Sequence, residues 1–390
     1  MTPSARLSAA IDILSDILAG DPAEKTLTNW ARRNRYAGSS DRAAIRDTVF
    51  DCLRLRRSCA YLGGGETGRG LVLGHLRATG LDIGALFNGQ GYAPAAPDGH
   101  ELSLPENLSG ACEAVQLDYP DWMSVLLRVS LGGDLAPVMT ALKSRAKTCL
   151  RVNIRKCDIT TAIAALEGDG IKAKPVAGVS FALEVTENPR KIALSSAYLT
   201  GLVEVQDAAS QAVVESLVLP GNGRVLDYCA GGGGKVLAMA ARANGTWFAH
   251  DADPHRMADL PARATRAGVD IACLSTDRLE SSGPFDLVFC DVPCSGSGAW
   301  RRAPASKWDL TENRLRELCG IQGQILASAA RLVAPGGQLV YATCSILACE
   351  NRDQIDQFQS DHPEVHLDFT KSFSPSDGAD GMFVAVLRCD

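Results

Sequence analysis

Two cysteines closely follow predicted strands, at positions where side chains often take part in catalysis. Cys294 follows the apolar run FDLVFCD, and Cys344 follows the run GQLVYAT. Both runs are typical of parallel strands, whose carboxyl ends meet at the ligand-binding edge of a sheet about 4.8 Å apart. A lone cysteine near a strand end is more often core filler than a nucleophile. Two that converge on one edge predict a site that uses thiol chemistry.

A glycine-rich turn after an earlier strand, GRVLD, forms a second candidate site. The turn runs from Asp227 to Lys235 and contains four consecutive glycines, Gly231 to Gly234. Glycines let the backbone approach a ligand closely, and the following helix N-terminus offers free N–H groups. The spacing is not that of a dinucleotide fingerprint, whose third glycine would fall at Val236.

Polar residues follow the other strands of the same region. Asp251 comes after the second strand, where a carboxylate can accept hydrogen bonds from ribose hydroxyls. Asp277 comes after the third strand and is a candidate for the base edge of the same ligand, although a loop residue or helix cap explains it equally well. Asp291 ends the fourth strand, and Arg301 and Arg302 follow a little later.

The elements that must position these residues follow from the hydrophobic pattern. From residue 206 to 390, β-branched apolar runs alternate with helical stretches, which predicts a doubly wound, mainly parallel sheet of Rossmann-like type. Residues 141–205 are interpreted as a small, moderately basic α/β module. Residues 1–140 have helical spacing and contain an arginine-rich stretch that is either a solvated helix face or a nucleic-acid contact.

Composition limits the classes of protein that fit. The chain has 390 residues, a formal net charge of −6 and 13 cysteines, without the C-x-x-C pairs or Cys/His spacing of a metal site. The sequence therefore predicts no metal. It shows neither a signal peptide nor an apolar run approaching the roughly 20 residues of a membrane span. We expect a cytoplasmic monomer with no membrane partner. The acidic total argues mildly against a nucleic-acid partner, although local charge matters more.

At this point the sequence resembles a known family, the Sun/RsmB-type (Nop2/Sun) RNA cytosine-5 methyltransferases. Three segments carry the resemblance: the turn DYCAGGGGK, the segment DVPCSGSG with a downstream RRAP, and the segment YATCS followed by Glu350 and Asn351. The resemblance covers about residues 140 to 390. A weaker likeness links the N-terminal helices, around DRAAIR, to the NusB-like domain of the RsmB branch.

The resemblance implies a class I methyltransferase domain at 206–390, an RRM-like module at 141–205 and a NusB-like RNA-binding domain at 1–140. It implies S-adenosylmethionine as cofactor and methylation of cytosine carbon 5 in RNA, with Cys344 as nucleophile and Cys294 helping to release the product. Asp291 and Lys235 complete the expected catalytic set, and Arg301, Arg302 and Lys307 are expected to grip phosphates of the RNA. The expected cofactor-binding residues are Asp227, Cys229, Ala230, Gly231, Gly232, Gly233, Gly234, Lys235, Asp251, Arg256, Asp277 and Asp291.

One position departs from the family pattern, because Gly232 stands where the family has a proline. The turn should therefore be looser, and cofactor affinity could suffer. Two alternatives to 16S-type ribosomal RNA methylation stay open: a tRNA cytosine-5 methyltransferase, and a ribosome assembly factor that binds RNA but has a vestigial catalytic site. Methylation of a small molecule or protein is disfavoured, because such reactions need no pair of thiols.

Overall fold

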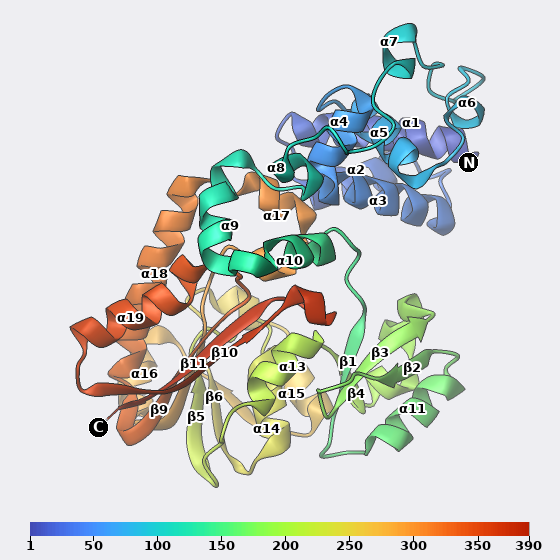
Figure 1. The fold of residues 1–390 in the computed structure, drawn as a ribbon. Coiled ribbons are helices and arrows are strands. Elements are labelled where there is room, and N and C mark those ends of the chain that lie inside the picture. Colours follow the sequence, from blue (N-terminus) through green and yellow to red (C-terminus); the bar gives the residue numbers. More distant parts are fainter. Residues whose placement is uncertain (390) are drawn as a thin grey trace. The chain divides into compact units, whose positions relative to one another are not determined.

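The structure is a computed structural model that describes residues 1–389 (Figure 1). The chain forms two compact units. The helical unit contains Met1–Arg128, Gly132–Arg145 and Trp300–Leu310. The sheet unit contains Val129–Leu131, Ala146–Ala299 and Thr311 onward. The division of the second unit into a small module and a methyltransferase domain remains a prediction from the sequence.

The helical unit is built around a core of apolar side chains at helical spacing. Its helices are α1 (Pro3–Leu18), α2 (Ala23–Arg33), α3 (Ser39–Arg54), α4 (Arg56–Gly63), α5 (Gly68–Thr79), α6 (Ile83–Leu86), α7 (Gly99–Leu102), α8 (Glu113–Gln116), most of α9 (Ser124–Leu131), α10 (Leu135–Leu142) and α17 (Pro304–Asp309). Leu14, Val49 and Leu71 from α1, α3 and α5 are fully buried in this core. Helices α4 and α5 approach closely, since a Cβ on Gly63 would lie 1.8 Å from the carbonyl oxygen of Gly70.

The late segment Trp300–Leu310 completes the helical unit. Its side chains cap the last turn of α3: Lys307 Nζ donates to the carbonyl of Arg54 at 3.2 Å, and Trp308 Nε1 donates to that of Leu53 at 2.6 Å. In return, Arg54 Nε donates to the carbonyl of Arg301 at 2.9 Å. Carbonyls at a helix C-terminus lack partners within the helix, so these contacts satisfy groups that would otherwise be left unpaired.

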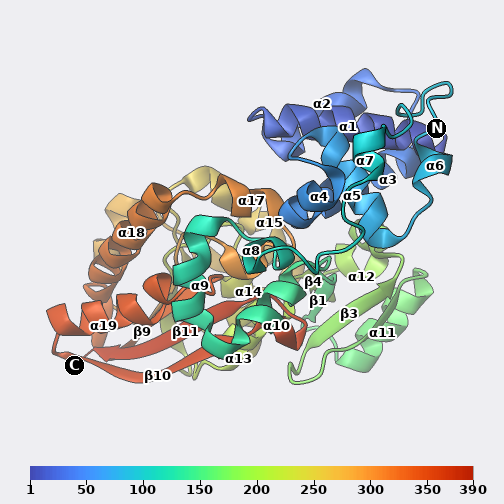
Figure 2. The ribbon, with the colours of Figure 1, turned by 45° about the horizontal axis from the view of Figure 1, so that its top comes forward.

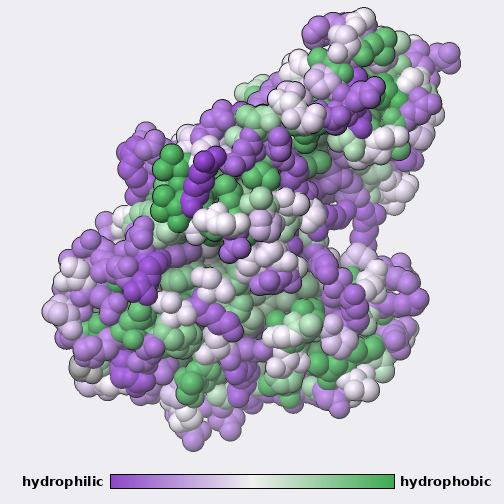
Figure 3. Space-filling view, in the orientation of Figure 1, coloured by the Kyte–Doolittle hydropathy of each residue, from purple (hydrophilic) through white to green (hydrophobic). Residues whose placement is uncertain are grey.

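The expectation that no apolar run approaches the length of a membrane span is wrong for one segment of this region, Asp121–Leu142, which is long and apolar enough by length and composition alone. In the fold it is broken at Gly132, where φ is +52°, into the short helices α9 and α10. Met123 and Met139 are buried in protein. These features are those of packed surface helices. On the face shown in Figure 3, hydrophilic and hydrophobic residues are mixed in small patches.

The first sheet of the sheet unit is small and antiparallel, in the order β2-β3-β1-β4. Its elements are β1 (Cys149–Val152), α11 (Ile159–Gly168), β2 (Lys172–Pro175), β3 (Ala182–Glu187), α12 (Ser196–Leu199) and β4 (Val203–Val205). Leu150 and Leu183 pack with α11 and α12 on one face. Cys149 and Ala182 pack with Ala208 of the next helix on the other. Both faces of this sheet therefore carry packed side chains.

The second sheet has seven strands in the order β10-β11-β9-β8-β5-β6-β7. The five strands from β7 to β9 in this order are parallel, and β10 and β11 add an antiparallel edge. The strands are β5 (Gly223–Asp227), β6 (Gly245–Ala249), β7 (Ile271–Cys273), β8 (Phe285–Asp291), β9 (Val333–Thr343), β10 (Val365–Phe373) and β11 (Met382–Cys389). The predicted doubly wound, Rossmann-like fold is confirmed.

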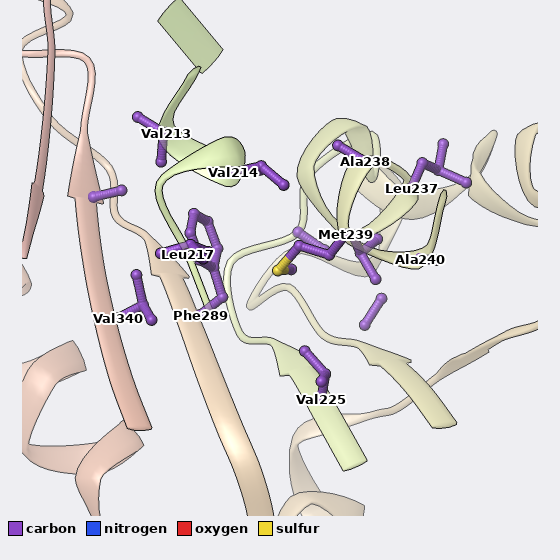
Figure 4. Close-up of a cluster of buried hydrophobic side chains, with 14 of the residues drawn as sticks. Val213, Val214, Leu217, Val225, Leu237, Ala238, Met239, Ala240, Phe289 and Val340 are labelled. Atoms are coloured by element: carbon purple, nitrogen blue, oxygen red, sulfur yellow. The ribbon is translucent and has the colours of Figure 1, made fainter. Parts of the chain in front are cut away.

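Helices cover both faces of this sheet (Figures 1 and 2). The helices are α13 (Ala208–Glu215), α14 (Gly234–Arg242), α15 (Leu260–Ala267), α16 (Leu279–Ser282), α18 (Glu312–Ala330) and α19 (Arg352–Asp361). Alternate residues of each strand point to opposite faces, so Val225 packs against α13 and α14 while Leu226 belongs to the core with α18 and α19. Figure 4 shows the first of these cores, where Phe289 and Val340 lie with Leu217.

Candidate active site

The two cysteines meet at the carboxyl ends of β8 and β9. These strands are neighbours and parallel, with Asp291 in register with Ala342. Cys294 Sγ lies 3.4 Å from Cys344 Sγ, and both residues are partly exposed. Both thiols are free. The convergence expected from the strand-end positions is therefore present, because the two sulfur atoms lie in contact.

The two thiols differ in acidity. A hydrogen bond from Cys294 lowers the pKa of the Cys344 thiol and outweighs burial and the nearby Asp291 charge, which both raise it. The same hydrogen bond and burial raise the pKa of Cys294 well above its ordinary value. Cys344 is therefore the thiol of the pair that ionises more readily. A thiolate is the nucleophilic form of cysteine, so the electrostatics favour Cys344 as the attacking group.

A lysine–aspartate pair lies beside the thiols. Lys235, in the first turn of α14, places Nζ 2.5 Å from Oδ2 of Asp291, the last residue of β8. Burial lowers the pKa of Lys235, but the adjacent Asp291 charge and hydrogen bond raise it by more, so the ammonium form persists. The pair therefore places two opposite charges near Cys344: Asp291 raises the pKa of that thiol and Lys235 lowers it.

Asp227, at the end of β5, is the most perturbed carboxyl group of this site. It is 1% exposed, and Oδ1 has no hydrogen-bond partner among residues 1–389. Burial, with the nearby Asp291 charge, raises the pKa of Asp227 from 3.8 to about 8. An unpaired, buried polar oxygen is costly and often marks a place that a ligand completes.

The glycine turn follows Asp227 and leads into α14. Gly231 and Gly233 have φ of +51° and +79°, in the left-handed region that favours glycine. A Cβ on Gly233 would lie 2.2 Å from a methyl carbon of Leu260. Ala230 N donates to the carbonyl of His250 at 2.8 Å, which ties the turn to β6. Cys229 lies beside it, where burial raises its thiol pKa.

Asp251 anchors this turn directly. Its Oδ2 accepts from Gly231 N at 2.9 Å and from Arg256 Nη1 at 3.0 Å, and its Oδ1 accepts from Asp253 N at 3.0 Å. The side chain of Arg256 is 58% exposed, whereas that of Asp251 is 4% exposed. The structure therefore brings Asp251 and Arg256 to the turn. The contacts give Asp251 a structural role that sequence reasoning did not assign.

The remaining expected residues belong to other elements. Asp277 is exposed in a 3₁₀ turn, Thr276–Arg278, after β7, where a hydrogen bond from Ser275 lowers its pKa. Arg301 and Lys307 belong to the helical unit, where they are 3% and 2% exposed. Burial lowers the pKa of Lys307 to about 8. Arg302 is exposed, so of the three cations expected to grip RNA it alone lies on the surface.

A buried carboxylate joins the two cysteine loops, and sequence reasoning gave it no role. Glu350 is fully buried and accepts from Ser295 N at 2.7 Å, Ser295 Oγ at 2.5 Å and Ser345 Oγ at 2.5 Å. These serines directly follow the two cysteines. Gln322 Nε2 of α18 adds a further donor at 3.0 Å. One side chain thus fixes both loops. A polar Gln322 within the apolar stripe of α18 was the sequence signal for this network.

The comparisons with known proteins agree with this geometry. Residues 215–388 match the family described as "16S rRNA methyltransferase RsmB/F", and residues 119–192 match the ferredoxin-like domain of RsmF/B-like methyltransferases. Ribosomal RNA small subunit methyltransferase B from Sodalis glossinidius is 33% identical over 262 residues, which are 65% of this chain and 59% of that protein. The protein of that name from Vibrio cholerae is 30% identical over 288 residues, 70% and 66% of the two chains. The chain thus spans roughly three-fifths of the length of these relatives.

Solved structures share the fold. PH0851 aligns over 99% of both chains with a TM-score of 0.77 and 23% identity. A methyltransferase homolog protein from Pyrococcus horikoshii aligns over 71% of this chain and 97% of its own, with a TM-score of 0.61 and 25% identity. With the family match over the whole of the seven-stranded sheet, the chain belongs to the Sun/RsmB-type methyltransferase family.

Proposed function

We propose that this protein is an S-adenosylmethionine-dependent methyltransferase that modifies carbon 5 of a cytosine in RNA, with ribosomal RNA of the 16S type as its substrate. The observation that carries the proposal is the 3.4 Å approach of Cys344 and Cys294 beside the Lys235–Asp291 pair. Methyl transfer to nitrogen or oxygen needs no covalent thiol. Transfer to carbon 5 of a pyrimidine does, because that carbon is a poor nucleophile until a thiolate adds to its neighbour.

The residues around the glycine turn fit the cofactor. S-adenosylmethionine carries an ammonium group, ribose hydroxyls and an electrophilic methyl group. The methyl group is what it supplies to the reaction when bound. Asp227 offers a buried oxygen that lacks a partner, suited to an ammonium group. The turn offers backbone that can approach closely, and Asp251 lies at its edge. Asp277 is the remaining candidate, for the adenine edge.

The chain's own groups can perform each proton and electron movement of the proposed reaction. Cys344 adds as thiolate to carbon 6, which makes carbon 5 an enamine carbon able to accept the methyl group. Asp291, held by Lys235, lies where a carboxyl can hydrogen-bond the ring as charge develops. Cys294 then helps remove the proton on carbon 5, so that the carbon–sulfur bond breaks and Cys344 leaves as thiolate.

The RNA substrate is supported by chemistry and by the names of the relatives. A cytosine must leave its stack to meet both thiols, so the target is single-stranded, looped or flipped. The relatives from Sodalis glossinidius and Vibrio cholerae are named for the small-subunit ribosomal RNA. Exposed Arg302 is our proposed phosphate contact. An enzyme that modifies ribosomal RNA acts where ribosomes are, which agrees with the expected cytoplasmic location. The monomeric state stays a prediction from the sequence.

The decisive experiment separates the two cysteines on a denaturing gel with labelled RNA and cofactor. Cys344→Ala should abolish methyl transfer and form no adduct, because the ring is never activated. Cys294→Ala should still attack and methylate, and should leave protein trapped on its RNA.

Three outcomes would contradict parts of this proposal. Adduct with Cys344→Ala instead of Cys294→Ala would reverse the roles. Full activity of both variants without adduct would exclude the covalent mechanism. A wild-type protein that binds RNA but neither binds nor uses S-adenosylmethionine would be the vestigial assembly factor. Bisulfite sequencing of RNA from a deletion strain would then distinguish ribosomal RNA from tRNA as the target.

A further inference from the structure

The glycine turn is held by side chains that come from outside it. The carbonyl of Gly232 accepts from Arg263 Nη1 of α15. The carbonyl of Gly234 accepts from Arg151 Nη1 at 2.7 Å and from Gln206 Nε2 at 3.1 Å. Arg151 lies on β1 of the small sheet, and Gln206 directly follows β4. Two carbonyls of one short turn are therefore fixed by three side chains.

The arginine on α15 is itself held by the small sheet. Glu204 of β4, whose side chain is 9% exposed, lies 3.5 Å from Arg263 and 2.8 Å from Arg266. Glu204 also pairs in register with Arg151 across the β1–β4 ladder. The support for both carbonyls thus originates in the same two short strands.

Arg263 occupies the space that a side chain at position 232 would fill. A Cβ built on Gly232 would lie 2.9 Å from Arg263 Nη1. Gly232, unlike its neighbours at 231 and 233, does not have positive φ, so its backbone accepts residues other than glycine. A larger residue at position 232 would restrict the backbone conformations of the turn by itself. Because the residue is glycine, side chains from other elements have to restrict the backbone instead.

We propose that Arg263, oriented by Glu204, is a positioning residue for the glycine turn, and that the small α/β module serves the cofactor site through this contact. The inference rests on the proposed function for its ligand, S-adenosylmethionine, but the contact itself can be tested without it. It deepens the role of the module, in which all four residues of β1, Arg151 among them, are buried.

The first test is hydrogen exchange of the protein without cofactor. Arg263→Met should speed exchange of the turn amides at Ala230, Gly231 and Gly233 about tenfold, since a charged donor to the turn is lost. Arg266→Met is the matched control. It removes the other arginine on Glu204, but within residues 1–389 Arg266 makes no hydrogen bond or ion pair with the turn, so exchange there should stay unchanged. Equal exchange in wild type and Arg263→Met would overturn the proposal.

The second test is calorimetric titration with S-adenosylmethionine. Arg263→Met should weaken binding about tenfold and Arg266→Met less than twofold. In a Gly232→Pro background, whose ring restricts the turn directly, Arg263→Met should change affinity less than twofold. A tenfold loss in both backgrounds would mean that Arg263 contacts the cofactor itself, and would overturn the positioning role. If wild type shows no binding while exchange still responds to Arg263→Met, the proposed function fails and the positioning role stands.

Discussion

In the proposed mechanism, the hydrogen bond between the two thiols would give Cys294 a part in the first chemical step as well as the last. In Cys294→Ala the donor 3.4 Å from Cys344 Sγ is lost. Hydrogen bonds to charged groups contribute about 1.5–3 kcal/mol, and a thiol is a weak donor, so we take the lower end. That corresponds to a rise of about one unit in the pKa of Cys344. The thiolate fraction near neutral pH should fall about tenfold.

The assay is the pH profile of iodoacetamide alkylation, read by mass spectrometry on the peptide that contains Cys344. Cys294→Ala should move the midpoint upward by about one pH unit. Cys294→Ser keeps a donor and should restore the wild-type midpoint. Cys273→Ala, which removes an exposed thiol on β7, is the control.

The reasoning is refuted if Cys294→Ala leaves the Cys344 midpoint unchanged or lowers it, because the hydrogen bond would then not stabilise the thiolate. If the midpoint rises as expected, the trapped adduct of Cys294→Ala should form about ten times more slowly than the wild-type reaction proceeds, in line with the smaller thiolate fraction.

Two further predictions concern the buried carboxyl groups. The pKa of Asp227 rises from 3.8 to about 8 on folding, so the unfolded chain loses the carboxyl proton at lower pH than the folded chain does. The contribution of Asp227 to the free energy of unfolding should therefore decline between about pH 4 and pH 8, by on the order of 5 kcal/mol. Asp227→Asn should lack this decline when its free energy of unfolding is measured with urea at pH 4 and pH 8. If the wild type and Asp227→Asn lose the same stability between these two pH values, the prediction is contradicted. Glu350→Gln removes the charge that four donors share and should cost about 2–4 kcal/mol of stability and slow alkylation of Cys344. An unchanged urea midpoint together with unchanged alkylation would show that Glu350 does not fix the cysteine loops.

The sequence was sufficient for the architecture of the larger sheet because its elements have clear periodicity. The helical spacing of residues 311–333 predicts a helix there, and α18 runs from Glu312 to Ala330. The spacing of residues 206–217 predicts another, and α13 runs from Ala208 to Glu215. The meeting of the two thiols followed from the geometry of parallel strands alone. The helix expected near Leu347 begins only at Arg352, after the 3₁₀ turn that carries Glu350.

The contacts that cross long stretches of sequence could not be predicted. The arginine-rich N-terminal stretch suggested a local positive excess, but Arg46 pairs with Glu24, Arg56 with Glu66, and Arg57 with Asp121. Those partners lie outside the arginine-rich stretch itself, which runs from residue 32 to residue 57. The role of Arg263 was hidden for the same reason, because its partner Glu204 belongs to a different sheet and their meeting depends on tertiary packing.

The late segment Trp300–Leu310 has a consequence for the order in which the protein is made. A ribosome that has synthesised the first 145 residues has produced every other part of the helical unit, but Lys307 and Trp308, which cap α3, are still about 160 residues away. At roughly 5–20 residues per second that interval lasts on the order of ten seconds or more. During it the last turn of α3 has no cap and the surface that Ala305 will cover is open. The helical unit is therefore completed only after the strand that leads to Cys294 has emerged, which links the maturation of the first part of the chain to that of the loop that carries Cys294.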